Sequence, residues 1–449
     1  MIPHLPRRNL LTGSLAMSAA IALPELRPSQ AQTSGSARIE LVRSPGGIEA
    51  WLVRQTHLPI IAIDFALRGG SSQDAPDKAG TANFLAAMID EGAADLTSQG
   101  FHQALEDRAI ELSFSASRDF FSGSMRMLSE HRDEAARLLK LAVQAPRFDA
   151  EPMERIRQAL LSSIRRASTN PGSIASETFW GMAFPGHPYG RRSSGTAASV
   201  AAITRDDLVA MRARLFAREH LKVAVVGDIT PDDLGRLLDD VFGPLAAKAA
   251  LTAVPEIAMA GLGERRVVPL EIPQTIISFG LPGLKRPDPD FIPAFVANHI
   301  LGGGSFSSRL YREVREKRGL AYSVSSGLAA LESTGLVTGG TSTRNDRAAE
   351  SLAVIQAEIA RMGAEGPTDE ELEQAKRYLI GAWAMRFETS NAIAANLIRI
   401  QLDGFGPDYL DRRNDLIDAV TMPDIRKAAA RLFADPRLLV TAVGKPEGL

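Results

Sequence analysis

An internal repeat is the feature of this sequence that most limits its possible folds. Residues 204–227 recur as residues 421–444, with a shared pattern of Thr, an Asp three positions later, Ala-Arg-Leu-Phe and an apolar run ending in Gly, always 217 residues apart. Thr204 and Thr421 can each accept a hydrogen bond from the first free amides of a helix, and the apolar run is typical of a buried strand. The chain is therefore expected to fold as two homologous halves.

The repeat continues less regularly toward the start of each half. Residues 60–67 match residues 275–281 at a separation of about 214, so small insertions intervene. Residues 243–264 are rich in Ala, Gly and Pro, which is typical of a linker. We expect a first half over residues 36–242 and a second half over residues 265–449.

Helical and strand patterns occur together within the halves. Residues 110–128 alternate apolar and polar side chains, as strands with one buried face do. Residues 133–143 and 370–385 carry apolar side chains at the period of a helix. The expected class is α+β, with helices packed on a mainly antiparallel sheet in each half.

Composition excludes several classes of function. The 449 residues carry a formal net charge of only -2, which gives no indication of nucleic acid or of a charged membrane surface as a partner. Cysteine is absent, so disulfides, thiolate catalysis and cysteine metal ligands are excluded. After the N-terminal segment no apolar run reaches the ~20 residues that would span a bilayer, so no membrane span is expected.

The first 31 residues are typical of a secretory signal. Arg7 and Arg8 precede the apolar residues 10–24, and Ala31 ends a small-residue cleavage site. Because Asn9 and two leucines follow the arginine pair directly, the segment resembles a twin-arginine signal, with an ordinary Sec signal as the alternative. We expect an exported, periplasmic protein.

A short helix after the first repeated strand carries the first resemblance to a known family. Residues 80–88 read Gly-Thr-Ala-Asn-Phe-Leu-Ala-Ala-Met, preceded by Leu-Arg-Gly-Gly and followed by Asp-Glu-Gly-Ala. This pattern resembles the pitrilysin (insulinase-type) zinc metallopeptidases, which include mitochondrial processing peptidase. There the helix carries His-x-x-Glu-His, whose histidines bind zinc and whose glutamate activates water. Asn83, Ala86 and Ala87 occupy these three positions here.

The third zinc ligand of the family is a glutamate in a later helix. The landmarks that follow it, Pro171 and Pro-Gly-His-Pro at residues 185–188, align Ser163 with that ligand, with neighbouring Ser162 as the alternative. None of the seven histidines lies within two helical turns of another, so a helical histidine pair is impossible. We expect no metal and no cofactor in this chain.

The second half keeps a different motif of the family. Residues 300–324 resemble its C-terminal signature, in which an arginine and a tyrosine contact substrate beside a glycine-rich loop. The resemblance assigns substrate binding to this set: Arg315, Tyr322, Gly302, Gly303 and Gly304.

The side chains of this segment are compatible with that role. Ser307 or Ser308 can cap a helix that ends at Gly319, and this turn would bring Arg315 near Tyr322. The guanidinium can donate to a peptide carbonyl, and the phenol can donate to an oxygen that gains negative charge. The alternative is a solvated basic face, in which arginines of the helix pair with glutamates four residues later.

The resemblance implies a division of labour between two chains. In two-chain relatives a subunit without zinc ligands closes a clamshell chamber with a zinc-bearing homologue that has His-x-x-Glu-His, and a peptide is the substrate. The expected function is therefore that of a noncatalytic, substrate-binding subunit of a heteromeric metalloendopeptidase, inactive alone, with zinc on its partner. The alternatives are a non-proteolytic scaffold or peptide-binding protein of the same fold, or a stand-alone hydrolase, for which no Gly-x-Ser-x-Gly motif is present.

Overall fold

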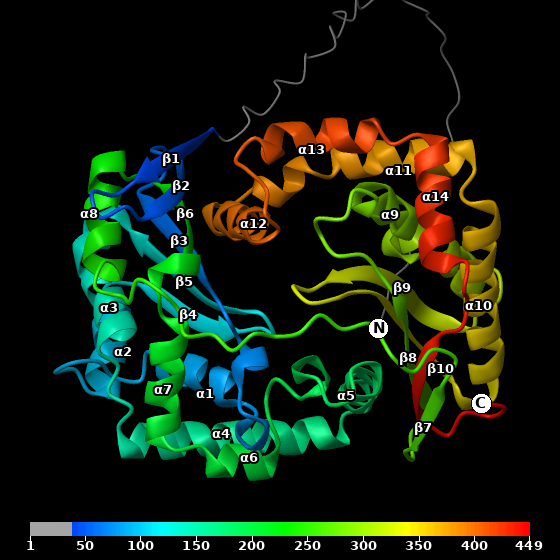
Figure 1. The fold of residues 1–449 in the computed structure, drawn as a ribbon, viewed down its shortest axis with the longest axis horizontal. Coiled ribbons are helices and arrows are strands. Elements are labelled where there is room, and N and C mark those ends of the chain that lie inside the picture. The colour runs from blue at the N-terminus through cyan, green and yellow to red at the C-terminus, as the bar shows by residue number, and fades with distance from the viewer. Residues whose placement is uncertain (1–37) are drawn as a thin grey trace, which may run out of the picture. The chain divides into compact units, whose positions relative to one another are not determined.

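Two mixed sheets organise the computed structural model, which describes residues 38–449 (Figure 1). The predicted signal, residues 1–31, lies outside the described residues. The elements that precede residue 243 are β1 Ile39–Arg43, β2 Glu49–Arg54, β3 Ile60–Arg68, α1 Thr81–Met88, α2 Ser98–Glu106, β4 Glu111–Ala116, β5 Phe120–Leu128, α3 Arg132–Gln144, α4 Ala150–Thr169, α5 Pro171–Ala183, α6 Ala197–Ala202, α7 Arg205–Leu215, β6 Lys222–Gly227 and α8 Pro231–Phe242.

The elements of the second half begin after residues 243–264, which contain neither helix nor strand. They are β7 Arg265–Pro269, β8 Gln274–Pro282, α9 Phe291–Asn298, β9 Ala321–Ala330, β10 Gly335–Arg344, α10 Ala348–Glu365, α11 Asp369–Gly381, α12 Ser390–Leu402, α13 Tyr409–Asp418, α14 Met422–Phe433 and β11 Leu439–Gly444. Two π-helical segments, η6 His299–Gly303 and η8 Tyr311–Glu316, lie between α9 and β9.

The two sheets have related topologies. The first has the strand order β1-β2-β6-β3-β5-β4 and the second β7-β11-β8-β10-β9. Each contains one parallel pair, β2 with β6 and β7 with β11, and its other neighbours are antiparallel. The expected α+β class with mainly antiparallel sheets is confirmed.

The helix and strand predicted from the repeat occur in both halves. Thr204 accepts a hydrogen bond from the Asp207 amide at the start of α7, and Thr421 does the same for Asp424 at the start of α14. In return, the aspartate accepts a hydrogen bond from the backbone N–H of the threonine in both helices, which completes a capping box and satisfies two free donors at each helix start. The strands that follow, β6 and β11, occupy equivalent central positions in the two sheets.

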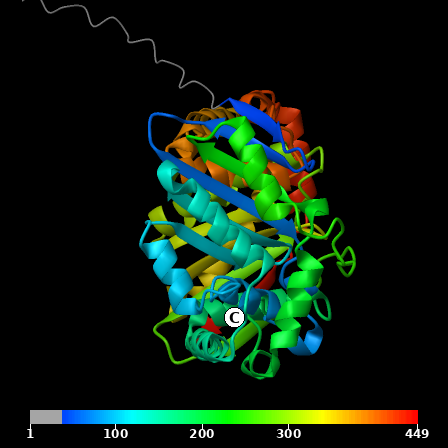
Figure 2. The same cartoon turned by 90° about the vertical axis from the view of Figure 1, so that its left-hand side faces the viewer.

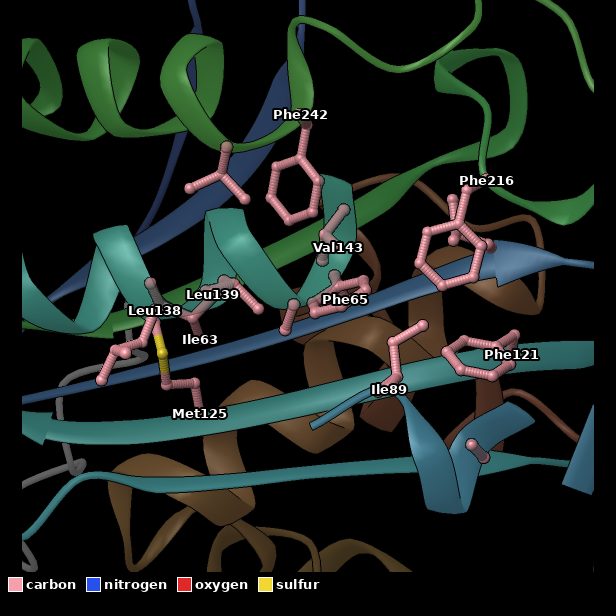
Figure 3. Packing of buried hydrophobic residues seen from close by; sticks show 14 of the residues in the cluster. Ile63, Phe65, Ile89, Phe121, Met125, Leu138, Leu139, Val143, Phe216 and Phe242 are labelled. Carbon is pink, nitrogen blue, oxygen red and sulfur yellow. The ribbon is translucent and has the colours of Figure 1, made fainter. Parts of the chain in front are cut away.

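Aromatic packing fills the core on one face of the first sheet. Figure 3 shows Phe65 of β3 beside Phe242 and Phe121 of β5 near Phe216, and both pairs have ring centroids 5.1 Å apart. Helices α1, α3, α7 and α8 contribute buried residues to this cluster, and helices lie across the strands of this sheet in Figure 2. Alternate residues of β3, such as Ala62 and Ala66, point to the opposite face.

Each half covers the opposite face of the other half's sheet with one helix. Helix α12 of the second half packs on β3 and β6, and α5 of the first half packs on β8 and β11 (Figure 1). Both contacts are apolar: Leu397 and Ile398 of α12 lie with Ala62 and Ala66, while Phe179 of α5 lies with apolar residues of the second half. Each half therefore contributes one helix that covers the sheet of the other half.

A glycine permits the close packing of α5 on β8. Gly280 of β8 is the repeat counterpart of Ala66 in β3, and a Cβ atom at Gly280 would lie 2.5 Å from Cζ of Phe179. Since real Cβ atoms do not approach so closely, only glycine lets the Phe179 ring come this near to the strand.

The prediction of a continuous helix over residues 370–385 is wrong at its C-terminal end. Helix α11 ends at Gly381, and a 3₁₀ turn, Ala384–Phe387, follows. Glycine disfavours helix continuation, and Trp383 is held by Arg413, whose guanidinium carbon lies 4.4 Å from the indole centroid. Apolar side chains continue at helical spacing past Gly381. The contact of Trp383 with Arg413 nevertheless forms outside a regular α-helix.

Candidate functional site

The start of α1 is fixed by a buried carboxylate. Asp74 accepts hydrogen bonds from the backbone N–H groups of Gly80 and Ala82, at 2.7 and 2.9 Å, and Gly80 has a φ of 98°, which glycine adopts readily. Burial raises the pKa of Asp74 to about 7, although these two hydrogen bonds and the charges of Arg191 and Arg214 act in the opposite direction. These contacts fix the point at which α1 begins.

The residues at the predicted ligand positions of α1 do not form a zinc site. Asn83 and Ala87 are half-buried and Ala86 is only 5% exposed. Ser163 is exposed on α4, which packs against α1, and neighbouring Ser162 accepts a hydrogen bond from Arg166. Amide, methyl and hydroxyl groups do not make the set of imidazole and carboxylate ligands that zinc requires. Across residues 38–449, no group of three His, Cys, Asp or Glu residues is arranged to hold a metal ion.

A cavity of about 320 Å³, lined mostly by residues of polar type, lies beside Asn83. Its wall includes Arg118 from the β4–β5 turn and Trp180 of α5, and the guanidinium carbon of Arg118 lies 3.8 Å from the indole centroid. Glu177 and Arg192 also line the cavity and form an ion pair with each other. Sequence reasoning missed this cavity.

The glycine-rich loop of the second half connects two π-helical segments. A Cβ atom at Gly302 would lie 2.4 Å from Oγ of Ser326 in β9, so this glycine is needed for close packing and is buried. Gly303 is exposed and Gly304 is half-buried, so these two are the accessible members of the predicted loop. Phe306, which sequence reasoning did not single out, follows the loop and is 70% exposed.

The helical turn that carries Arg315 begins and ends as the sequence predicts. The Ser308 hydroxyl accepts from the amide of Tyr311 at 3.4 Å. At the other end Gly319 has a φ of 59°, and its amide donates to the carbonyl of Arg315 at 2.9 Å. This bond, with glycine in the left-handed region, is the αL ending of a helix.

The structure brings Arg315 and Tyr322 together. The guanidinium carbon of Arg315 lies 4.5 Å from the ring centroid of Tyr322 and 4.8 Å from that of Tyr311, one helical turn earlier. Arg315 also donates a hydrogen bond to the hydroxyl of Tyr311. Tyr322, at the start of β9, is 79% exposed. The arginine is thus held between two aromatic rings, one of which faces solvent.

The alternative of a solvated basic face is wrong for Arg309. Its side chain is buried and forms a two-pronged ion pair with Glu371 of α11, with N–O distances of 2.8 and 2.6 Å. Glu313, the partner that the four-residue spacing suggests, pairs instead with Lys317 and Arg318. The reason is tertiary, because α11 brings a carboxylate to Arg309 from 62 positions along the chain.

The two halves of the chain match two domains of one protein family. Residues 54–197 match the family described as insulinase (peptidase family M16), and residues 202–379 match the peptidase M16 inactive domain. The chain belongs to the M16 peptidase family. The first half of this M16 chain contains the degenerate α1 positions, and its second half contains Arg315 and Tyr322.

Relatives of this M16 chain include proteins with and without a peptidase name. It is 28% identical to "Non-peptidase homolog YmxG" of Helicobacter pylori over 74% of this chain and 77% of that protein. It is 26% identical to an uncharacterized zinc protease of Mycobacterium leprae over 90% of both chains. The match to a domain described as inactive and the missing zinc-ligand set together support a noncatalytic M16-like protein.

Solved structures agree with the fold. A peptidase M16 inactive domain from Pseudomonas fluorescens superposes with a TM-score of 0.85 at 28% identity, over 91% of this chain and 98% of that one. A protease from Helicobacter pylori superposes with a TM-score of 0.81 at 18% identity and shows the fold alone, over 91% of this chain and 99% of that one. In the part of the chain that the structure describes, no helix is long and apolar enough to cross a membrane.

Proposed function

We propose that this chain is the substrate-binding subunit of a heteromeric metalloendopeptidase and is inactive alone. Its partner is a homologous subunit with His-x-x-Glu-His, which supplies the metal chemistry, and the two chains together enclose a chamber for a peptide. The observation that carries the proposal is an asymmetry: α1 has no zinc ligands, whereas Arg315 and Tyr322 lie together with the tyrosine ring 79% exposed.

The geometry of Arg315 and Tyr322 suits the recognition of a peptide backbone. Arg315 is oriented by Tyr311 rather than by a carboxylate, so its charge is not neutralised by an ion pair within residues 38–449. Its guanidinium can donate to a peptide carbonyl oxygen, and the exposed Tyr322 hydroxyl can donate to the same or a neighbouring oxygen. The exposed Gly303 and the half-buried Gly304 give the loop before this segment the backbone freedom to adjust to a bound peptide.

Reconstitution tests this proposal directly. The purified mature chain is mixed with its zinc-bearing homologue from the same organism, and complex formation is measured by sedimentation while peptide cleavage is followed by fluorescence. We expect a stable complex whose cleavage rate exceeds that of the zinc-bearing subunit alone. A complex without a gain in rate, or the absence of any complex, would contradict the proposal and favour the non-proteolytic alternative.

We also propose that the protein is exported to the periplasm. The support is the arginine pair, apolar stretch and small-residue site of residues 1–31. Cell fractionation with N-terminal sequencing of the mature chain tests this, and the expected new N-terminus is Gln32. A variant with Lys at Arg7 and Arg8 distinguishes the routes, because it blocks twin-arginine export and leaves Sec export intact.

A further inference from the structure

The cavity beside Asn83 contains hydrogen-bond donors that the fold does not use. Within residues 38–449, the one hydrogen bond of the Arg118 side chain runs from Nε to the carbonyl oxygen of Tyr189, at 3.2 Å. Its two terminal nitrogens form none, and no carboxylate forms an ion pair with this guanidinium there. The Asn83 amide, which lines the same cavity, also lacks a hydrogen-bond partner in the described chain.

The guanidinium of Arg118 is pre-positioned. One face of it lies on the Trp180 ring at 3.8 Å, and Nε is held by the backbone, so the two terminal nitrogens keep a fixed direction. An arginine ordered in this way loses little further entropy when it binds a planar two-oxygen anion. Burial lowers the pKa of Arg118, which means that its charge is under-solvated, and a bound anion would offset that cost.

The charges around the cavity favour an anionic ligand. Glu177 is already paired with Arg192, whereas Arg118 and Arg191 each donate one hydrogen bond to a backbone carbonyl and form no ion pair within residues 38–449. Arg118 also experiences the charge of neighbouring Asp119, but both of its terminal nitrogens are free of hydrogen bonds in the described chain, and the Asn83 amide adds one neutral donor. A carboxylate matches this set, because its two oxygens fit the guanidinium fork. The volume of about 320 Å³ is at the lower limit for ligand pockets and suits one residue of a peptide.

We propose that this cavity, bounded by Asn83, Arg118 and Trp180, binds a carboxylate group of a peptide, either its C-terminus or an acidic side chain. The inference deepens the proposed peptide-binding role and adds a second contact, in the first half of the chain, to that of Arg315 and Tyr322. It needs neither the partner subunit nor the metal.

Trp180 provides a local signal for the test. The chain has three tryptophans, and the Trp180→Phe variant assigns the indole N–H resonance of Trp180 in the NMR spectrum of the mature protein. Three probes are titrated to millimolar concentration: N-acetyl-Leu-Ala-Leu as free acid, the same peptide as C-terminal amide, and N-acetyl-Leu-Glu-Leu as C-terminal amide. We expect the Trp180 resonance to shift with the free acid or the Glu peptide, which distinguishes the two sources of carboxylate, and not with the Ala amide.

Three variants separate recognition from folding. Arg118→Gln is expected to weaken carboxylate binding by ~10-fold or more, since a charge-assisted hydrogen-bond pair is lost. Arg118→Lys keeps the positive charge but not the two parallel donors, so its affinity for the carboxylate should lie between those of the wild type and Arg118→Gln. Asn83→Asp places a competing carboxylate in the cavity and should abolish the shift, which keeps the test valid if Arg118→Gln does not fold. Arg236→Gln, at an exposed arginine of α8 paired with Asp233, is the matched control and should bind as the wild type does.

Two outcomes would overturn the carboxylate site. One is an equal Trp180 shift from the Ala amide, and the other is no shift from any probe. Neither outcome touches the reconstitution experiment, so a chain that fails here and still raises the cleavage rate of its partner retains the proposed function without this site. If carboxylate binding were normal but the chain did not raise the cleavage rate of its partner, the carboxylate site would stand and the proposed subunit function would be contradicted.

Discussion

The two halves treat the segment after their first repeated strand differently. In the first half α1 is a regular helix whose Ala86 is packed into the core, and the positions matched to zinc ligands contain no suitable donor. In the second half the equivalent α9 runs into η6, a glycine loop and η8, and this irregular segment positions Arg315. Departures from regular helix geometry are costly and often mark functional sites. The irregular backbone thus lies where the candidate functional side chains are, whereas the segment without zinc ligands is regular.

The first test of this difference between the halves removes the ion pair that ties the irregular segment to α11. Arg309→Ala leaves the Glu371 carboxylate without its main partner, and we expect a loss of about 3 kcal/mol in the free energy of unfolding, measured with urea. Arg312→Ala is the matched control, because Arg312 is more exposed and contacts the same carboxylate, and it should cost less than about 1 kcal/mol.

The same pair predicts a pH dependence. Burial acts to raise the pKa of Glu371, but hydrogen bonds from Arg309 and the Thr368 amide, with the charges of Arg309 and Arg312, outweigh it and hold the pKa at about 2. A depressed pKa stabilises the fold above the ordinary glutamate value of 4.5, and this stability is lost as the pH falls from 4.5 toward 2. Arg309→Ala should flatten the unfolding free energy in that window, and an unchanged slope would contradict the pairing.

The second test removes the candidate substrate contact. We expect Arg315→Ala to lower kcat/KM of the reconstituted complex by ~100-fold, because a donor to a peptide oxygen is lost, without changing complex formation in sedimentation. Lys317→Ala removes a neighbouring exposed cation that pairs with Glu313 and should have little effect. If Lys317→Ala were equally damaging, general electrostatics would explain the result and the specific role of Arg315 would be lost.

The third test asks whether α1 can regain a ligand without cost. Ala86→Glu places a carboxyl group where the methyl is 5% exposed, and we expect a loss of about 2 kcal/mol of unfolding free energy at pH 7. Since burial raises the pKa of such a group, the loss should be smaller at pH 4 than at pH 8. Ala87→Glu, at a half-buried position one residue later, is the control and should cost less. Equal losses would mean that burial at residue 86 is not the cause.

The smallest effect is expected at the exposed tyrosine. Tyr322→Phe removes one hydroxyl, and kcat/KM of the complex should fall ~10-fold, the equivalent of one hydrogen bond. Because this side chain is largely solvent-exposed, the unfolding free energy should change by less than about 0.5 kcal/mol. A large loss of stability would reassign Tyr322 to a structural role.

Features set by neighbours along the chain were predictable from sequence. The caps at Thr204 and Thr421, the helix ending at Gly319 and the closeness of Arg315 to Tyr322 depend on residues a few positions apart. For the same reason the absence of zinc ligands from α1 could be read directly.

Features set by tertiary contacts were not predictable. Arg309 has a glutamate four residues later, yet it pairs with Glu371, and no periodicity indicates that choice. The cavity at Asn83 needs Arg118 from a strand turn and Trp180 from a later helix, so one sequence gives no signal for it. Tyr311 could have been found, since it lies one helical turn before Arg315.

Because α5 and α12 each cover the sheet of the other half, this chain cannot be divided into two independent domains without exposing apolar surface. A gene cut within residues 243–264 would give two fragments, each with an uncovered apolar sheet face and each carrying the helix that fits the other fragment. Separately expressed fragments should aggregate, whereas co-expressed fragments should find each other and reassemble. Despite the internal repeat, each half is therefore expected to need the other in order to fold.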